Sequence, residues 1–221
     1  RKAVSVFEAD RRSAEDVLNA ASRSCTSGRS PGGSREEGRE RWPRTRTDGA
    51  ATRGGRTCVI RCRHQGPLRV QRPFYPEGEV GHIYILHPPG GLVAGDQLTV
   101  SAHCRPGARA LLTTPAAGRV YHSNRAQLPQ TQNAELTVDA GASCEWLPQE
   151  NILFAGALAH NRVCVRLAPG ADYTGWEITC LGRPAAGELF ASGRLVQSCE
   201  VWRDGRPLLI ETSRIAGSSP Q

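Results

Sequence analysis

Residues 98–114 read Leu98-Thr99-Val100-Ser101-Ala102-His103-Cys104-Arg105-Pro106-Gly107-Ala108-Arg109-Ala110-Leu111-Leu112-Thr113-Thr114, which is a strand-like run, a Pro-Gly turn and a second strand-like run. The same plan recurs around two later turns, Asp139-Ala140-Gly141-Ala142 and Ala168-Pro169-Gly170-Ala171, with the turn glycines 34 and 29 residues apart. Units that each complete their core on a neighbour are typical of solenoids. The pattern predicts a mainly β fold of stacked β-strand layers, a β-helix-like solenoid with few helices. A β-sandwich fits the short strands and regular turns as well.

The strands expected from this repeat come in pairs. They are Leu98–Cys104 and Arg109–Thr114, Ala134–Val138 and Ser143–Leu147, and Arg162–Leu167 and Tyr173–Leu181. A further pair, Leu195–Trp202 and Pro207–Glu211, is joined by Asp204-Gly205, a dipeptide that favours the type I′ turn of a β-hairpin.

The segment that begins at Arg56 alternates in character, with Cys58, Ile60, Cys62 and His64 at every second position. A strand would place these side chains, two thiols and an imidazole among them, on one face. A metal site there is the weaker interpretation, because residues two apart on a strand lie far apart for a shared ion.

The net charge of +7 is unevenly distributed along the 221 residues. Residues 1–50 carry a net charge of +3, residues 51–75 carry +6 with no acid, and residues 76–221 carry −2. A mildly acidic body argues against a dedicated nucleic-acid binder. Nucleic-acid binding through the basic segment Arg53–Arg72 remains as an alternative.

Composition also divides the chain into segments. Residues 1–53 combine low hydrophobicity with dense charge, which predicts a disordered basic and polar leader. Residues 54–217 form the expected β domain, and residues 218–221 a tail. No apolar run is long enough to span a membrane. Eight cysteines without C-x-x-C spacing, and no signal peptide, indicate reduced thiols in the cytoplasm.

Enzyme motifs are missing: the chain has no nucleophile elbow, phosphate-binding P-loop, H-E-x-x-H or dinucleotide fingerprint. The candidate functional residues are acids among apolar neighbours. Asp96 ends a long loop shaped by Pro88, Pro89, Gly90, Gly91 and Gly95. The other acids are Glu145, Glu150, Glu177 and Glu211. Each either points outward or pairs with an arginine, or lines an interior space where it could pass a divalent cation along.

Several unusual motifs, in order, resemble one family. They are Gly66-Pro67-Leu68-Arg69-Val70-Gln71-Arg72-Pro73-Phe74-Tyr75-Pro76-Glu77, His87-Pro88-Pro89-Gly90-Gly91 with Gly95-Asp96, Leu112-Thr113-Thr114-Pro115, Glu145-Trp146-Leu147-Pro148-Gln149-Glu150, Cys180-Leu181-Gly182-Arg183-Pro184 and Trp202-Arg203-Asp204-Gly205-Arg206-Pro207-Leu208-Leu209. Over about Gly54 to Gly217, the chain is similar to the urease accessory proteins UreD, also called UreH.

This resemblance implies a mainly β helical-stack fold and a non-enzymatic role. Family members bind apo-urease, form a complex with the accessory protein UreF and the GTPase UreG, and deliver nickel to the urease active site. It also implies an internal water-filled passage for transient nickel(II), with no tightly bound cofactor. Asp96, Glu177 and Glu211 are the matched acids expected to line it, with Glu150 and Glu145 next.

The chain departs from the family pattern at both ends. Family members normally continue past the end of this chain, and residues 1–50 have no counterpart in them. Ala94 stands where a glycine is common in the loop. These departures leave a second expectation open, a truncated fragment that does not function.

Overall fold

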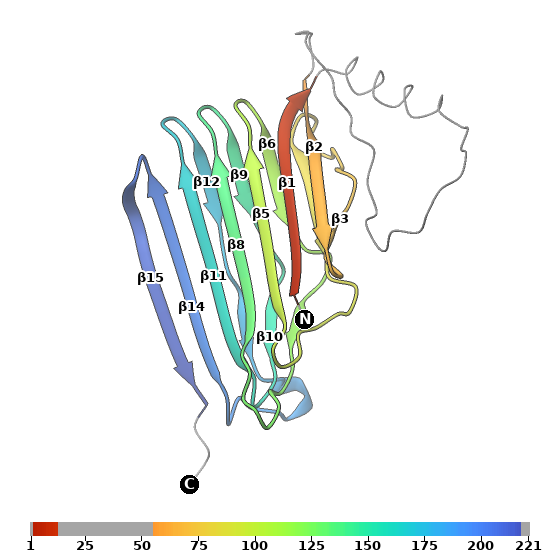
Figure 1. Ribbon diagram of the computed structural model, residues 1–221, viewed down its shortest axis with the longest axis vertical. Helices are drawn as coiled ribbons and strands as arrows, with labels where there is room; N and C mark the ends of the chain where they lie inside the picture. The colour runs from red at the N-terminus through yellow and green to blue at the C-terminus, as the bar shows by residue number, and fades with distance from the viewer. Residues whose placement is uncertain (1, 13–54, 218–221) are drawn as a thin grey trace, which may run out of the picture.

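The structure is a computed structural model that describes residues 2–12 and 55–217 (Figure 1). It is mainly β, as the sequence predicts, and the helical content of the described residues is one short 3-10 helix, η1 (Pro184–Ala186). No helical segment in this part of the chain has the length and apolar character that a membrane span requires.

The largest layer is a seven-stranded sheet in the order β15-β14-β11-β8-β5-β1-β2. Its strands are β1 (Lys2–Arg12), β2 (Arg56–Gln65), β5 (Gln97–Cys104), β8 (Gln130–Val138), β11 (Leu158–Leu167), β14 (Arg194–Arg203) and β15 (Arg206–Ala216). From β5 to β14 the neighbours are parallel, whereas β2 and β15 pair antiparallel at the two edges.

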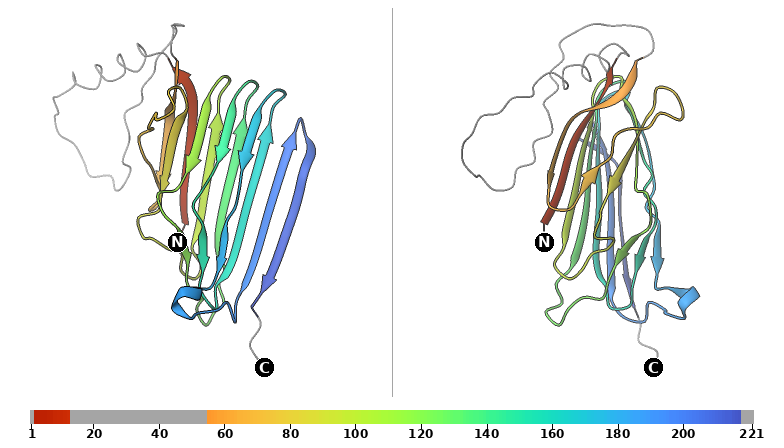
Figure 2. Two further views of the ribbon diagram at one scale, coloured as in Figure 1. Left: turned by 180° about the vertical axis from the view of Figure 1, so that it is seen from behind. Right: turned by 90° about the vertical axis from the view of Figure 1, so that its right-hand side faces the viewer.

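Two smaller sheets face this layer (Figure 2). The five-stranded one has the order β12-β9-β6-β4-β3, and the three-stranded one has the order β13-β10-β7. Their strands are β3 (Arg69–Val70), β4 (Gly81–Leu86), β6 (Arg109–Thr113), β7 (Gly118–Val120), β9 (Ser143–Trp146), β10 (Asn151–Leu153), β12 (Asp172–Gly175) and β13 (Thr179–Leu181).

The chain therefore winds as a solenoid, and the stacked-layer prediction is confirmed. Three successive coils, β5-β6-β7, β8-β9-β10 and β11-β12-β13, each contribute one strand to each sheet. The turn glycines Gly107, Gly141 and Gly170 have positive φ of 75°, 69° and 68°, which residues with a side chain rarely adopt. The alanine after each glycine is buried, so each turn also contributes to the core.

The expected strand Tyr173–Leu181 is wrong as a single element. The structure divides it into β12 and β13, which belong to different sheets, with Trp176, Glu177 and Ile178 between them. The chain has to change direction there, because the coil passes from the second sheet to the third. This corner brings Glu177 toward the interior.

The predicted leader is also wrong for residues 2–12, since they form β1 inside the large sheet. β1 lies between β5, its parallel neighbour, and β2, its antiparallel neighbour. Ala3, Ser5, Phe7 and Ala9 are each at most 1% exposed and face the core. The composition of residues 1–53, averaged over their many charged residues, hides this alternation of buried and exposed side chains. The rest of the predicted leader, residue 1 and residues 13–53, lies outside the described residues.

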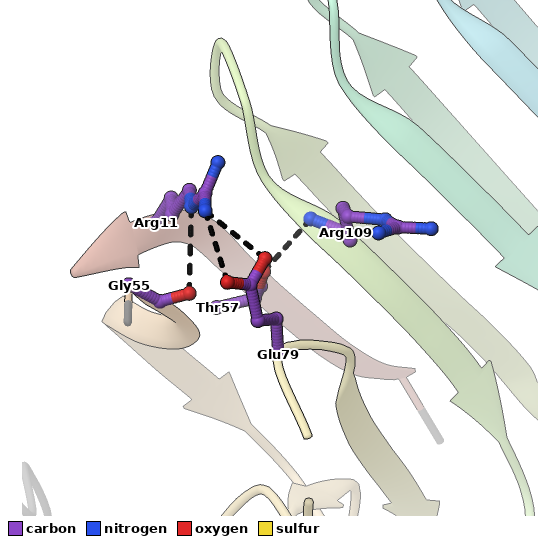
Figure 3. Close-up of polar contacts among 5 residues, drawn as sticks. All are labelled: Arg11, Gly55, Thr57, Glu79 and Arg109. Carbon is purple, nitrogen blue, oxygen red and sulfur yellow. Dashed lines mark hydrogen bonds and ion pairs between the residues drawn. The ribbon is translucent and has the colours of Figure 1, made fainter. Parts of the chain in front are cut away.

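Polar contacts tie the end of β1 to the body (Figure 3). The guanidinium of Arg11 donates to both carboxylate oxygens of Glu79, at 3.1 and 3.0 Å, and to the carbonyl of Gly55 at 3.4 Å. Nearby, the buried hydroxyl of Thr57 on β2 accepts a hydrogen bond from the backbone N–H of Arg109 on β6, at 2.8 Å. Four segments distant in sequence therefore meet at this corner.

A β-bulge overturns the expected common face of Cys58, Cys62 and His64. Phe7 pairs with Cys62 and Ala9 with Val59, so Ile60 is an extra residue on β2. An extra residue reverses the alternation beyond it. Cys62 therefore lies on the inner face with Phe7, while Cys58 lies on the outer face and contacts the hydroxyl of Tyr75 at 3.4 Å.

The predicted hairpin is confirmed as β14 and β15, joined at Asp204 and Gly205, which have positive φ of 50° and 74°. β15 is the edge strand of the large sheet, and all of its residues are exposed. Figure 1 shows β14 and β15 extending the large sheet past β12, the edge strand of the five-stranded sheet.

Candidate functional site

The candidate site is a cavity of about 180 Å³ between the sheets of the solenoid. The large sheet contributes Gln132 and Asn161, and the facing layers contribute Trp146, Asn151 and Glu177. A buried water needs roughly 10–15 Å³ of such volume and two to four polar partners. The cavity is therefore large enough for several water molecules, and these polar side chains supply partners for them in a largely apolar wall.

Glu177 is the carboxylate that lines this cavity. Its Oε1 accepts a hydrogen bond from the indole N–H of Trp146, at 2.9 Å. Burial raises the pKa of the Glu177 carboxyl above its ordinary 4.5, and the hydrogen bond from Trp146 offsets part of that effect. A cation in the cavity would stabilise the charged form of this buried carboxylate.

Asn161, on β11, is a functional candidate that the sequence reasoning missed. Its side chain is buried, and neither of its amide atoms makes a hydrogen bond within the described residues. In register with it lie Gln132 on β8 and Gln197 on β14. The amide of Gln132 donates to Asn151 Oδ1 at 3.2 Å. Amides at one level of three adjacent strands were the available signal.

Asp96 lies beside the cavity rather than in its lining. It is 7% exposed, and its Oδ2 accepts a hydrogen bond from the backbone N–H of Val93 at 3.0 Å. The loop before it turns at Gly90 and Gly95, with φ of 75° and 82°. At Gly91 an added Cβ would collide with the ring of Tyr121, so the backbone approaches that ring closely.

His87 connects Asp96 with the cavity, because it lines the cavity and responds to the charge of Asp96. Burial lowers the pKa of His87 below its ordinary 6.5, and the nearby Asp96 carboxylate partly opposes this. His87 is therefore a neutral imidazole at pH 7.

Glu211 lies outside the cavity, on β15. It pairs with Cys199 on β14. Burial raises the pKa of the Cys199 thiol, and the charges of Glu177 and Glu211 raise it further. Cys199 thus lies within electrostatic reach of both carboxylates. Glu177, Cys199 and Glu211 form a series from the cavity toward the edge of the large sheet.

Two of the expected acids are not brought to the cavity. Glu145 alternates on β9 with the buried Cys144 and Trp146, so its side chain lies on the outer face of that sheet. Glu150 stands between two lining residues, Gln149 and Asn151, but does not line the cavity. The expectation that Glu145 faces the interior is therefore wrong, because strand alternation sends it outward.

The basic segment Arg53–Arg72 does not present a uniform charged face over its described part. Arg56 lies over the ring of Tyr75 at 5.1 Å, and Arg61 pairs with Glu8 at 3.6 Å. Arg69 donates to the carbonyls of Gly66 and Leu68. These arginines make contacts within the protein that a nucleic acid would have to replace.

Residues 46–221 match the family described as UreD urease accessory protein. The chain is similar to the urease accessory protein UreD of Hahella chejuensis, with 45% identity over 192 residues, which is 86% of this chain and 62% of the relative. It is 48% identical to UreD of Klebsiella aerogenes over 158 residues, 72% of this chain and 58% of the relative. For UreD of Nostoc sp. the identity is 50% over 169 residues, 76% and 60%. The chain thus spans less than two thirds of the length of each relative.

Proposed function

Since this chain belongs to the UreD family of urease accessory proteins, we propose that it acts in urease maturation as a non-enzymatic scaffold that helps deliver nickel to the urease active site. Its proposed partners are apo-urease, UreF and, through UreF, the GTPase UreG. Nickel(II) is cargo that binds transiently. The proposed compartment is the cytoplasm, since the cysteines of the described residues are free thiols.

The observation that carries the proposal is the cavity between the sheets, with the Glu177 carboxylate and several amide side chains in its largely apolar wall. Passage of an ion requires binding that is favourable enough for entry and weak enough for exit. Carboxylate, amide and water oxygens bind a borderline cation such as nickel less firmly than thiolates or imidazoles do. A cavity with these donors suits transient occupancy better than storage.

The proposed route uses three acids at different positions. Asp96 lies beside His87 at the wall of the cavity, Glu177 faces its interior, and Glu211 lies beyond Cys199 on β15. Asn161 is added to this route, because its amide can orient water or the hydrated ion. Glu145 is omitted, since its side chain lies on the outer face of β9.

The test compares Glu177→Gln with Glu145→Gln in a urease activation assay with apo-urease and the other accessory proteins. Glutamine at position 177 can still accept the hydrogen bond from Trp146 but removes the charge. We expect Glu177→Gln to lower the nickel content of urease severalfold, measured by mass spectrometry of the metal, while Glu145→Gln leaves it unchanged.

A pull-down of apo-urease by each variant separates docking from delivery. Both variants are expected to retain apo-urease as the unchanged chain does. Equal nickel content of urease with both variants would contradict a role of the cavity in delivery. Loss of apo-urease binding by Glu177→Gln would instead assign Glu177 to docking.

A further inference from the structure

A thiol and an imidazole meet on the inner face of β2, away from the cavity. Cys62 Sγ lies 3.3 Å from His64 Nε2, although two residues on one strand usually hold their side chain ends farther apart. Both side chains are half-buried, so solvent and ions can reach them. Neither residue lines the cavity described above.

The neighbouring strand β1 fixes this pair. Ser5 pairs with His64 and Phe7 with Cys62 in the antiparallel register. The buried hydroxyl of Ser5 lies 3.1 Å from His64 Nδ1. In the tautomer that carries its proton on Nδ1, the ring donates this hydrogen bond to Ser5 and directs the lone pair of Nε2 toward Cys62. A metal-binding histidine is oriented in this way by a partner on its second nitrogen.

The separation of the two donor atoms suits a shared ion. With bonds of about 2.3 Å to sulfur and about 2.0–2.1 Å to nitrogen, two tetrahedral ligands of one zinc ion stand roughly 3.5 Å apart. The observed distance of 3.3 Å is close to this separation. Thiolate and imidazole are the ligands that zinc and similar soft or borderline cations select.

From this geometry we infer that Cys62 and His64, oriented by Ser5, form a two-ligand site for a zinc-like divalent cation. Binding replaces the thiol proton of Cys62, which leaves to solvent, and water completes the coordination. The described residues contain no group of three or more His, Cys, Asp or Glu side chains that could hold a metal. A site with two protein ligands leaves its other coordination positions to water, so its ion exchanges with solution.

The test titrates the complete 221-residue chain with cadmium and zinc, without urease or other partners. Cadmium is expected to give the ultraviolet charge-transfer band of a cadmium–thiolate bond. Zinc is expected to protect Cys62 from alkylation, as measured by mass spectrometry of the peptides. Because no urease is present, failure here leaves the proposed function untouched, and the reverse also holds.

Matched variants assign the ligands. Cys62→Ser should abolish the band, His64→Gln should remove the zinc protection of Cys62, and Ser5→Ala should weaken cadmium binding by about 10–100-fold. Cys58→Ser is the control, because Cys58 lies on the same strand but on the opposite face. Circular dichroism checks that each variant keeps the β fold.

Two results would overturn the inference. One is equal zinc protection of Cys62 in the unchanged chain and in folded His64→Gln. The other is equal protection of Cys58 and Cys62, which would mean that zinc binds thiols without a built site. If His64→Gln does not fold, the test rests on Cys62→Ser. A cadmium band of full strength in that variant would also overturn the inference.

Discussion

At the scale of single residues, the notable feature is polar side chains on an otherwise apolar inner face. Asn161 occupies a position where its neighbours on β11 with the same orientation, Ala159 and Val163, are buried and apolar. A buried amide without a partner costs about 1–3 kcal/mol relative to a satisfied or apolar side chain. A free-energy cost of this kind is expected at a site that has to hold water or an ion.

Replacement of Asn161 tests that interpretation. We expect Asn161→Leu to raise the free energy of unfolding by about 1 kcal/mol, because the unsatisfied amide is removed and the adjacent cavity can take the larger side chain. The same variant should lower nickel transfer to urease. Urea denaturation and the metal content of urease measure the two effects, and a stabilised variant with full nickel transfer would contradict the proposed role.

His87 gives the pH prediction at this scale. Burial holds its pKa in the folded chain below 6.5, so the unfolded chain takes up a proton at a higher pH than the folded chain does. The stability that depends on neutral His87 is complete above pH 6.5 and is lost as the pH falls. The free energy of unfolding should therefore decline less steeply between pH 7 and pH 5 in His87→Gln than in the unchanged chain. Parallel declines in urea titrations would be evidence against a buried neutral His87.

At the scale of elements, β1 decides what the first residues contribute. Its pairing with β5 joins Lys2 to Gln97 and Ala9 to Cys104, so a segment far away in sequence lies next to the first coil. Its inner face adds Phe7, 1% exposed, to the main core. Removal of β1 would expose that core and leave β2 without a partner strand.

Two neighbouring positions on β1 make this testable. Phe7→Ala should destabilise the chain by about 3–5 kcal/mol, the range for a buried aromatic side chain. Val6→Ala, at a position 40% exposed on the other face, should change stability by no more than about 0.5 kcal/mol. Chemical denaturation measures both. Equal small effects would mean that residues 2–12 are a detached leader after all.

At the scale of the whole molecule, the two layers have different extents. The large sheet continues through β14 and β15, whereas the two facing sheets end at β12 and β13. Leu208, Ile210 and Ile215 of β15 are 57%, 60% and 37% exposed. A long edge strand with exposed apolar side chains is a template for pairing with another chain.

We expect the 221-residue chain to fold cooperatively. Because of its exposed edge strand, we also expect it to associate at high concentration. Ile210→Lys should shift its gel filtration profile toward the monomer, because a charge on an edge strand opposes pairing. Val93→Lys is the control, at a loop position with 47% exposure. Unchanged association with Ile210→Lys would place the contact elsewhere, and a chain without cooperative unfolding would instead support the expectation of a non-functional fragment.

Local sequence was sufficient for the coils and the hairpin. Gly107, Gly141 and Gly170 mark turns that need positive φ, and Asp204-Gly205 marks the tight turn between β14 and β15. Because these requirements belong to single residues and their neighbours, they are readable without knowledge of the fold. The family, and with it the proposed role, was likewise recognisable from ordered motifs.

The positions of the site residues depend on contacts between distant segments, which no local sequence pattern shows. Local patterning could not place Glu177 in the cavity, because that placement depends on where the coil turns between β12 and β13. The bulge at Ile60 separates Cys58 from Cys62, and it exists only in the pairing of β2 with β1. Membership of β1 in the sheet is itself a contact between the first residues and the first coil.

The sequence by itself thus determined the repeated turns, the stacked strands and the family. Only the tertiary structure decided that residues 2–12 complete the large sheet, which acids approach the cavity, and that Cys62 meets His64. The reason is physical: turn geometry is set by the φ preferences of adjacent residues, whereas the face of a side chain is set by register. Register in turn depends on hydrogen bonds between strands that are distant in the chain.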